Sequence, residues 1–284
     1  MKRNSIKTHL FGYALFIAII FTFSSINYGQ KADKQTKTKD FCTDNWSSGD
    51  KASFSEIREM TLRPTGLLDV DASRNGGIRV KGENRADILV RACVRTWGET
   101  DEAARAAARG IRIGNDSTVR AEGVSENSNA SVSYEILVPR STNLKLDTFN
   151  GGISISGVDG NIEFGATNGG VNLSDVAGSV KGKTTNGGIY VTLSGNAWKG
   201  SGLDVETTNG GVHLVLPDNF AARVETSTVN GGFSSDFREL NVDKDENDRR
   251  RGVSISKDIN GGGALIRVVT TNGGVKISSA AKDM

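Results

Sequence analysis

The chain has 284 residues, of which 36% are hydrophobic, 24% are charged and 6% are aromatic, with 35 Gly against 3 Pro. This content of charged residues and of strand-forming Val and Ile argues against a disordered chain, and the glycines lack the Gly-X-Y period of collagen. The formal net charge is +2. Without Lys2, Arg3 and Lys7, which lie in a leader that has no acids, the 35 basic groups become 32 against 33 acidic ones, or −1. Nucleic acid and anionic membranes are therefore not expected as partners.

The first residues have the pattern of an export signal. A basic start precedes an apolar core of 14 residues, LFGYALFIAIIFTF, at positions 10–23, and a short polar end follows it. A membrane-spanning helix needs about 20 apolar residues, so this core is short for a span. We predict a signal peptide at 1–29 with cleavage before Gln30, and a mature chain without a membrane span that is periplasmic, secreted or on the cell surface. Retention of the leader as an N-terminal anchor is the alternative.

A charged linker and a possible disulfide follow. Residues 30–54 contain few apolar side chains and are expected to be a linker, and the folded domain is expected at 55–281. Cys42 and Cys93 are the two cysteines of the chain. In DILVRACVRTW the alternate apolar residues form one face of a strand, so Cys93 points to the other face and is available to staple the N-terminal segment. An oxidising compartment permits that bridge, and two unpaired thiols are the alternative.

An Asn-Gly-Gly motif recurs along the chain. From Asn150 the intervals are 18, 18, 23 and 21 residues, then 42, which is twice 21, and a degenerate copy stands at Asn260. Repeats of this length indicate stacked supersecondary units. We predict structural turns at Asn75 and Gly76, Asn150 and Gly151, Asn168 and Gly169, Asn186 and Gly187, Asn209 and Gly210, Asn230 and Gly231, and Asn272 and Gly273.

Each motif is flanked by residues that alternate between apolar and polar. Apolar residues stand six and four positions before the Asn and three and five positions after it, which is the period of a strand on both sides of a turn. We expect the Gly residues to supply positive φ in that turn. The inward rows contain Leu144, Ile162, Val180, Leu203, Val224 and Ile266 before the turn and Ile153, Val171, Ile189, Val212, Phe233 and Val275 after it.

Two all-β architectures fit this pattern. Asn-Gly is a strong hairpin signal, so an antiparallel, hairpin-based fold is one alternative. In the other, each 18–23-residue repeat is one coil of a parallel β-solenoid and equivalent positions stack. The position five before the Asn favours the solenoid, because stacking would place residues of opposite charge side by side along most of the row. That row contains Lys145, Glu163, Lys181, Asp204 and Glu225.

Two segments depart from the repeat. A cap at Thr100 or Asp101, an Ala-rich run and Gly110 predict a short helix over about 101–109, whose Ala face would cover one end of the solenoid. The charged stretch 241–252 is expected to be a protruding, solvated loop.

The run from SVSYEILVPR to TSTVNGG resembles the bacterial envelope family known as "putative adhesin", a domain of unknown function with repeated T-x-N-G units. The upstream pieces NGGIRVKG, ADILVRACVR and ETDEAARAAA are similar to the amino-terminal part of the longer members, so the resemblance covers about residues 55–278. It implies a β-helical solenoid. It carries no established catalytic residues and so implies no site residue in this sequence.

The chemistry-bearing residues do not assemble into a recognisable catalytic or metal-binding motif. The best carboxylate pair, Asp204 and Glu206, is expected to lie in an exposed ladder beside Lys181 and Lys183. His213 is the only histidine beyond the leader, so neither a Ser-His-Asp site nor a zinc site has its ligands. Trp198 is more typical of a core residue than of a sugar-stacking platform. We therefore expect no catalytic residues, no cofactor and no metal.

The sequence thus predicts a non-enzymatic, exported β-solenoid that acts as an interaction or adhesion scaffold at the cell envelope or surface. Its partner would be an envelope protein or a polysaccharide. The alternatives are a polysaccharide-active β-helix enzyme, which would need clustered carboxylates in a groove, and an accessory protein in envelope stress or signalling.

Overall fold

The computed structural model describes residues 41–42, 51–124, 129–241 and 252–282. All of them belong to the unit Lys39–Met284, and the description below concerns that unit alone. The expected signal peptide 1–29 lies outside the described residues, as do most of the expected linker 30–54 and of the expected charged loop 241–252. Within the linker region, residues from Ala52 onward already belong to a strand.

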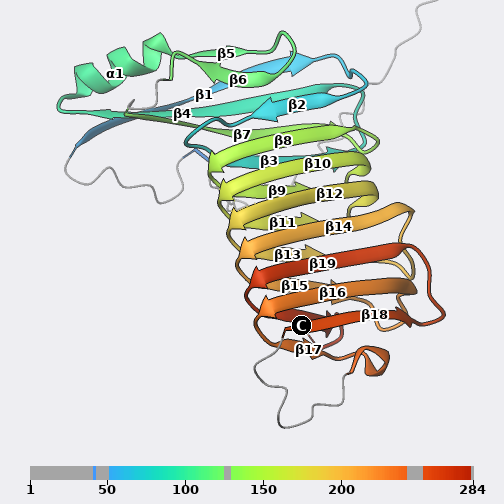
Figure 1. The fold of residues 1–284 in the computed structure, drawn as a ribbon. Helices are drawn as coiled ribbons and strands as arrows, with labels where there is room; N and C mark the ends of the chain where they lie inside the picture. The colour runs from blue at the N-terminus through green and yellow to red at the C-terminus, as the bar shows by residue number, and fades with distance from the viewer. Residues whose placement is uncertain (1–40, 43–50, 125–128, 242–251, 283–284) are drawn as a thin grey trace, which may run out of the picture. The chain divides into compact units, whose positions relative to one another are not determined.

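The unit is all-β with one α-helix, and its strands form two ten-stranded sheets (Figure 1). In spatial order, sheet A contains β1 (Ala52–Leu62), β4 (Ile88–Gly98), β7 (Ala130–Pro139), β3 (Ile78–Glu83), β9 (Ile153–Ser156), β11 (Val171–Ser174), β13 (Ile189–Thr192), β15 (Val212–Leu216), β20 (Val275–Ser279) and β17 (Phe233–Ser235). Sheet B contains β18 (Val253–Ile259), β16 (Ala222–Asn230), β19 (Leu265–Asn272), β14 (Gly200–Asn209), β12 (Ala177–Asn186), β10 (Asp159–Asn168), β8 (Leu144–Asn150), β2 (Leu68–Asp71), β6 (Val119–Glu122) and β5 (Arg112–Gly114).

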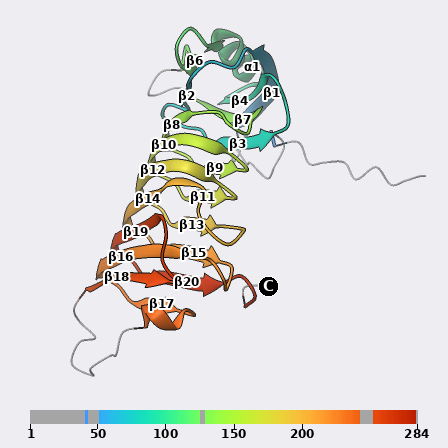
Figure 2. The ribbon, with the colours of Figure 1, turned by 90° about the vertical axis from the view of Figure 1, so that its right-hand side faces the viewer.

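Most neighbouring strands are parallel, and antiparallel pairs occur near the ends of the sheets. The antiparallel pairs are β1 with β4, β4 with β7, β5 with β6, and β16 with β18. Figure 2 shows the parallel strands of the repeats stacked along the unit, with β19 between β14 and β16. Both sheets are therefore mixed, with long parallel stretches.

The Asn-Gly-Gly motifs lie where the chain passes from sheet B to sheet A. Asn168, for example, ends β10 of sheet B, and Val171 begins β11 of sheet A. Because the two strands belong to different sheets, the motif is not the tip of an antiparallel hairpin. Equivalent positions of consecutive repeats pair instead, as Asn168 does with Asn186 and Val171 with Ile189.

The inward rows of the repeats form the core between the two sheets. All twelve residues that the alternation places six before and three after the Asn are at most 9% exposed. Along β11, buried and outward residues alternate as the period of two requires. The expected assignment of faces is thus found in both sheets.

The helix α1 (Asp101–Gly110) covers strands at the N-terminal end of sheet A (Figure 1). The Thr100 hydroxyl caps it by accepting from the amide of Ala103 at 3.2 Å. Its buried residues are Ala104 and Ala108, and the Thr96 hydroxyl of β4 donates to the Ala104 carbonyl at 2.7 Å. The helix extends one residue beyond the expected 101–109.

The last repeat of the sequence does not lie at the end of the stack. Strand β19 lies between β14 and β16 in sheet B, and β20 lies between β15 and β17 in sheet A. The degenerate motif at Asn260 is not a repeat turn: Asn260 has φ of 46° and its side-chain amide donates to the carbonyls of Asp218 and Phe220. The segment before it forms the antiparallel edge strand β18. The 3₁₀ helix η1 (Arg238–Leu240) follows β17.

Candidate functional site

The asparagines of the seven predicted turns form one continuous hydrogen-bonded ladder. Six of the seven side-chain amides donate to the side-chain carbonyl of the neighbouring Asn, at 2.7 to 3.0 Å, and Asn75 accepts at the end of the ladder. The order along the ladder is Asn75, Asn150, Asn168, Asn186, Asn209, Asn272 and Asn230. The Asn of the motif therefore links one repeat to the next, and the late position of Asn230 reproduces the strand order of the sheets.

The first glycine of each motif is required by close packing and not, as expected, by positive φ. Gly187 and Gly210 have no positive φ, and among the seven first glycines only Gly273 does. A Cβ placed on Gly187 would lie 2.2 Å from the carbonyl oxygen of Gly169 in the neighbouring repeat. On five other first glycines an added Cβ would likewise lie 1.7 to 2.2 Å from the carbonyl oxygen of the first glycine in the neighbouring repeat; these are Gly151, Gly169, Gly210, Gly231 and Gly273. On Gly76 it would lie 1.8 Å from the carbonyl oxygen of Val132.

A threonine two positions before the Asn completes the motif. The buried Thr207 hydroxyl donates to the carbonyl of Gly187 in the neighbouring repeat at 2.7 Å. The hydroxyl thereby satisfies a backbone carbonyl at the contact between two repeats. The same bond is made by Thr148, Thr184, Thr228 and Thr270, each to the first glycine of a neighbouring repeat. The T-x-N-G-G pattern is thus accounted for by stacking.

Cys42 and Cys93 are joined by a disulfide. The bridge holds the short segment 41–42 on β4, where Arg95 donates to the carbonyls of Cys42 at 3.2 Å and Phe41 at 3.1 Å. The guanidinium of Arg91 lies 5.3 Å from the centre of the Phe41 ring. Three side chains of β4, those of Arg91, Cys93 and Arg95, therefore bind the segment 41–42. This agrees with the outward position expected for Cys93.

The outer face of sheet B carries a ladder of alternating charge. In the order in which their strands pair, the residues of this ladder are Asp69, Lys145, Glu163, Lys181, Asp204, Arg267 and Glu225. Arg267 separates the two acids that would otherwise be neighbours, because β19 is inserted between β14 and β16. Its guanidinium lies 2.5 Å from the Asp204 carboxylate and 4.0 Å from that of Glu206. This acid pair is therefore part of an exposed ion-pair ladder.

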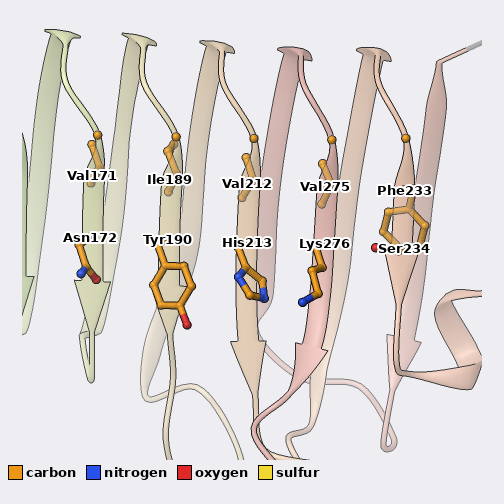
Figure 3. A pocket seen from close by; sticks show the side chains of 15 residues that line it. Val171, Asn172, Ile189, Tyr190, Val212, His213, Phe233, Ser234, Val275 and Lys276 are labelled. Atoms are coloured by element: carbon orange, nitrogen blue, oxygen red, sulfur yellow. The ribbon is translucent and has the colours of Figure 1, made fainter. Parts of the chain in front are cut away.

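The outer face of sheet A is hollowed by a groove of about 860 Å³ that crosses five strands (Figure 3). Each of β11, β13, β15, β20 and β17 contributes the second glycine of its motif, the buried residue after it and the next, outward residue. The outward residues are Asn172, Tyr190, His213, Lys276 and Ser234. We call this feature the sheet A groove.

The middle of the sheet A groove is occupied by an aromatic pair. The rings of Tyr190 and His213 meet edge to face with centroids 4.9 Å apart, and Tyr190 remains 38% exposed. His213 Nε2 lies 2.9 Å from the hydroxyl oxygen of Ser278. These contacts fix the two rings against each other, and His213 pairs with Lys276 of the neighbouring strand β20.

The family of the chain follows from a comparison with family models, because residues 73–278 match the model of Toastrack DUF4097, a domain of unknown function. The chain belongs to the Toastrack DUF4097 family. None of the curated proteins compared with it matches. No helix in the described part of this Toastrack chain is long and apolar enough to cross a bilayer.

Solved structures resemble this Toastrack chain at low identity. One, described as a putative cell adhesion protein from Clostridium sporogenes, has 13% identity and a TM-score of 0.43, over 80% of this chain and 100% of its own. Another, a putative adhesin from Bacteroides fragilis, has 10% identity and a TM-score of 0.30, over 79% and 97%. A third, a putative lipid binding protein from Parabacteroides distasonis, has 8% identity and a TM-score of 0.26, over 78% and 96%.

The chemistry available in the sheet A groove of this Toastrack domain is polar recognition. His213 and Ser278 are within hydrogen-bond distance, but Ser278 is only 1% exposed, so its hydroxyl is not placed to attack a substrate. Burial raises the pKa of Asp147 on β8 and that of Tyr134 on β7, and neither residue lines the groove. Among the described residues, no group of three or more His, Cys, Asp or Glu side chains could hold a metal ion.

The sequence reading missed the sheet A groove, although its signal was present. The outward residues four positions after each Asn form one row, whereas His213 was considered from the sequence only as a single histidine. Aligning that position across the repeats would have placed Tyr190, His213 and Lys276 together. Trp198, considered as a sugar platform, is 8% exposed and donates its indole N–H to the Gly178 carbonyl at 3.0 Å.

Proposed function

We propose that this Toastrack protein is an exported parallel β-solenoid that acts without catalysis as an interaction scaffold at the cell envelope or surface, and that it binds its partner in the sheet A groove. The observation that supports this proposal is the contrast between the two outer faces. Sheet B presents charges that are compensated by their neighbours in the ladder, whereas sheet A presents a hollow lined by an aromatic pair and polar groups. Concave surfaces with an aromatic and a few polar groups are typical of binding sites.

Rigidity supports the role of a scaffold. The Asn ladder, the Thr hydroxyls and the packed glycines fix the spacing of neighbouring repeats, so the five strands of the groove present their side chains in a constant register. A preorganised surface loses little conformational entropy on binding. A partner that engages several strands at once would gain avidity from each additional contact.

Two features support export. The first residues have the organisation of a signal peptide, and the Cys42–Cys93 disulfide is a bond that persists in oxidising compartments outside the cytoplasm. Intact-mass measurement of the protein recovered from the native envelope tests this part of the proposal. A mature chain that begins near Gln30 is expected, and recovery of the full-length chain in the cytosol would contradict it.

The binding proposal is tested by capture from native envelope material. The purified domain is compared with a Tyr190→Ala variant and with a Lys181→Ala control, which changes the sheet B ladder on the opposite face. We expect Tyr190→Ala to lose the captured partner and Lys181→Ala to retain it. Equal capture by all three proteins would show that the sheet A groove is not the binding surface.

The absence of catalysis is tested on polysaccharides and peptidoglycan by measuring new reducing ends and unsaturated products. We expect no turnover. Turnover that disappears in Asp204→Ala or Glu206→Ala would instead identify a polysaccharide-active enzyme on the outer face of sheet B.

A further inference from the structure

The sheet A groove offers hydrogen bonds from the side chains of its outward row. The carbonyls of its glycine floor are already used, since Gly170, Gly188 and Gly211 accept the amides of Ile153, Val171 and Ile189 in neighbouring strands. A ligand therefore meets the hydroxyl, amide, imidazole and ammonium groups of the outward row. These groups are carried by Asn172, Tyr190, His213, Lys276 and Ser234.

This arrangement does not suit an extended peptide or a nucleic acid. A peptide has an N–H and a C=O in almost every residue that need partners, and it finds them at a sheet edge, whereas β13 and β15 are paired on both sides. A nucleic acid needs several cations along its phosphates, whereas Lys276 is the only Lys or Arg among the described residues that line the groove.

We infer that the sheet A groove binds a linear polysaccharide that carries carboxylate groups, an inference that rests on the proposed function. The groove crosses five strands at a spacing of about 4.8 Å, so it suits a linear chain better than a compact ligand. The exposed Tyr190 ring provides an apolar face for a sugar ring, and the neighbouring polar side chains match hydroxyl groups. Lys276 gives the groove a positive charge, and no carboxylate stands among its described lining residues; Asp236, outside the groove, also feels this charge, but its carboxylate is already bound by Lys282 and the Ser279 amide. A polymer that carries carboxylates would complement this charge.

The experiment measures binding of the full domain to polygalacturonate and to the same polymer after complete methyl esterification, which removes its charge. We expect the acidic form to bind more tightly. Tyr190→Ala should weaken binding to the acidic form about tenfold, and Lys276→Gln should remove most of the preference for it. Lys181→Ala, in the sheet B ladder, serves as the matched control and should bind as the parent does.

The outcomes separate the ligand class from the proposed function. If alginate, hyaluronan and polygalacturonate all fail to bind, or if Tyr190→Ala binds them as the parent does, the polysaccharide inference is wrong. The proposed function would still stand if Tyr190→Ala lost its partner from envelope material. If Tyr190→Ala binds the polysaccharides and captures the envelope partner as the parent does, the polysaccharide inference and the proposed function are both wrong.

A second inference concerns the end of the Asn ladder. In six of the seven motifs the amide of the first glycine donates to the backbone carbonyl of an Asn in the next repeat, as Gly187 does to Asn209 at 3.0 Å. In the described part of the chain the amide of Gly231 has no such acceptor, because β16 and β17 are the last parallel strands of the repeats. Asn230 donates to Asn272, and no Asn amide of the described residues donates to it in return.

We propose that, among the asparagines of the seven motifs, Asn230 undergoes spontaneous deamidation fastest in the folded protein. The Gly231 nitrogen attacks Cγ of Asn230, a new N–C bond forms, the C–N bond of the side-chain amide breaks, and ammonia leaves with the proton of the Gly231 amide. Water then opens the cyclic imide to Asp or isoaspartate. In the other six motifs the glycine nitrogen is held by its hydrogen bond to the next repeat, and it cannot approach the side chain without breaking that bond.

Peptide mapping of the full chain, aged in mildly alkaline buffer, tests this assignment. We expect deamidation at Asn230 to be several-fold faster than at Asn186, and the two rates to converge in urea. An Asn230→Gln variant should remove the main deamidated species and leave the others unchanged. Equal rates at Asn230 and Asn186 in the folded protein would overturn the assignment.

Discussion

The packing of the repeat glycines gives the sharpest test of the fold. Gly187→Ala adds a Cβ that would lie 2.2 Å from the Gly169 oxygen, where ordinary contact begins at 3.4 Å. The two groups must therefore separate by about 1.2 Å, which is a quarter of the spacing of about 4.8 Å between strands. The hydrogen bond from the Thr184 hydroxyl to the same oxygen, at 2.8 Å, lies in the region that must move.

The expected cost follows from these two effects. Overpacking of a tight site destabilises a protein by about 1 to 3 kcal/mol, and weakening a buried hydrogen bond adds about 1 kcal/mol. We therefore expect Gly187→Ala to lower the free energy of unfolding by about 2 to 4 kcal/mol. In a domain of this size that corresponds to a fall in Tm of roughly 4 to 16 °C.

Gly232→Ala is the matched control, because it changes a glycine of the same motif in another repeat. A Cβ at Gly232 would have no heavy atom within 4 Å, and Gly232 has no positive φ. Replacing Gly232 by Ala reduces the backbone freedom of the unfolded chain, so the free energy of unfolding should rise by about 0.4 to 1 kcal/mol. Thermal and urea unfolding followed by circular dichroism measure both variants. An unchanged Tm for Gly187→Ala, or an equal loss in both variants, would refute the close-packing argument.

Four further changes have definite expected outcomes. Thr207→Val removes the hydroxyl that donates to the partly buried Gly187 carbonyl and should lower the free energy of unfolding by about 1 to 3 kcal/mol in urea, whereas Thr226→Val replaces a buried hydroxyl that makes no hydrogen bond with the described residues and should cost nothing or stabilise. Replacing both Cys42 and Cys93 by Ser should lower the free energy of unfolding by about 4 kcal/mol, because the bridge spans a sequence separation of 51. Thiol titration of the denatured, unreduced parent should find no free thiol. Lys181→Ala, in an exposed ladder, should change stability by less than about 1 kcal/mol, and a larger loss would show that this ladder supports the fold.

The sequence predicted the local structure well because the period of two is read directly from side chains. The buried rows, the helix after Thr100 and the position of the turns between strands all follow from local chemistry. The cause of the glycine requirement did not follow, since the sequence cannot distinguish a residue with positive φ from one that touches a neighbouring carbonyl. That distinction depends on how repeats stack.

Long-range order was the part that the sequence could not supply. Nothing local to residues 265–272 indicates that they pair between two earlier strands, so Glu225 was expected beside Asp204 where Arg267 lies. The sheet A groove was missed for a similar reason. Its residues come from five strands, and each of them alone is an ordinary outward side chain.

The insertion of β19 and β20 inside the stack has a consequence for biosynthesis. As the chain leaves the ribosome, β16 and β17 are made before the strands that separate them from β14 and β15. Repeats cannot simply be added one after another at a growing end; the final arrangement must wait until the last strands have been synthesised. A nascent chain released before residue 265 would lack β19 and β20, which lie inside the stack and not at its end. Premature termination is therefore expected to expose two facing sheet edges in mid-stack, which are surfaces prone to aggregation.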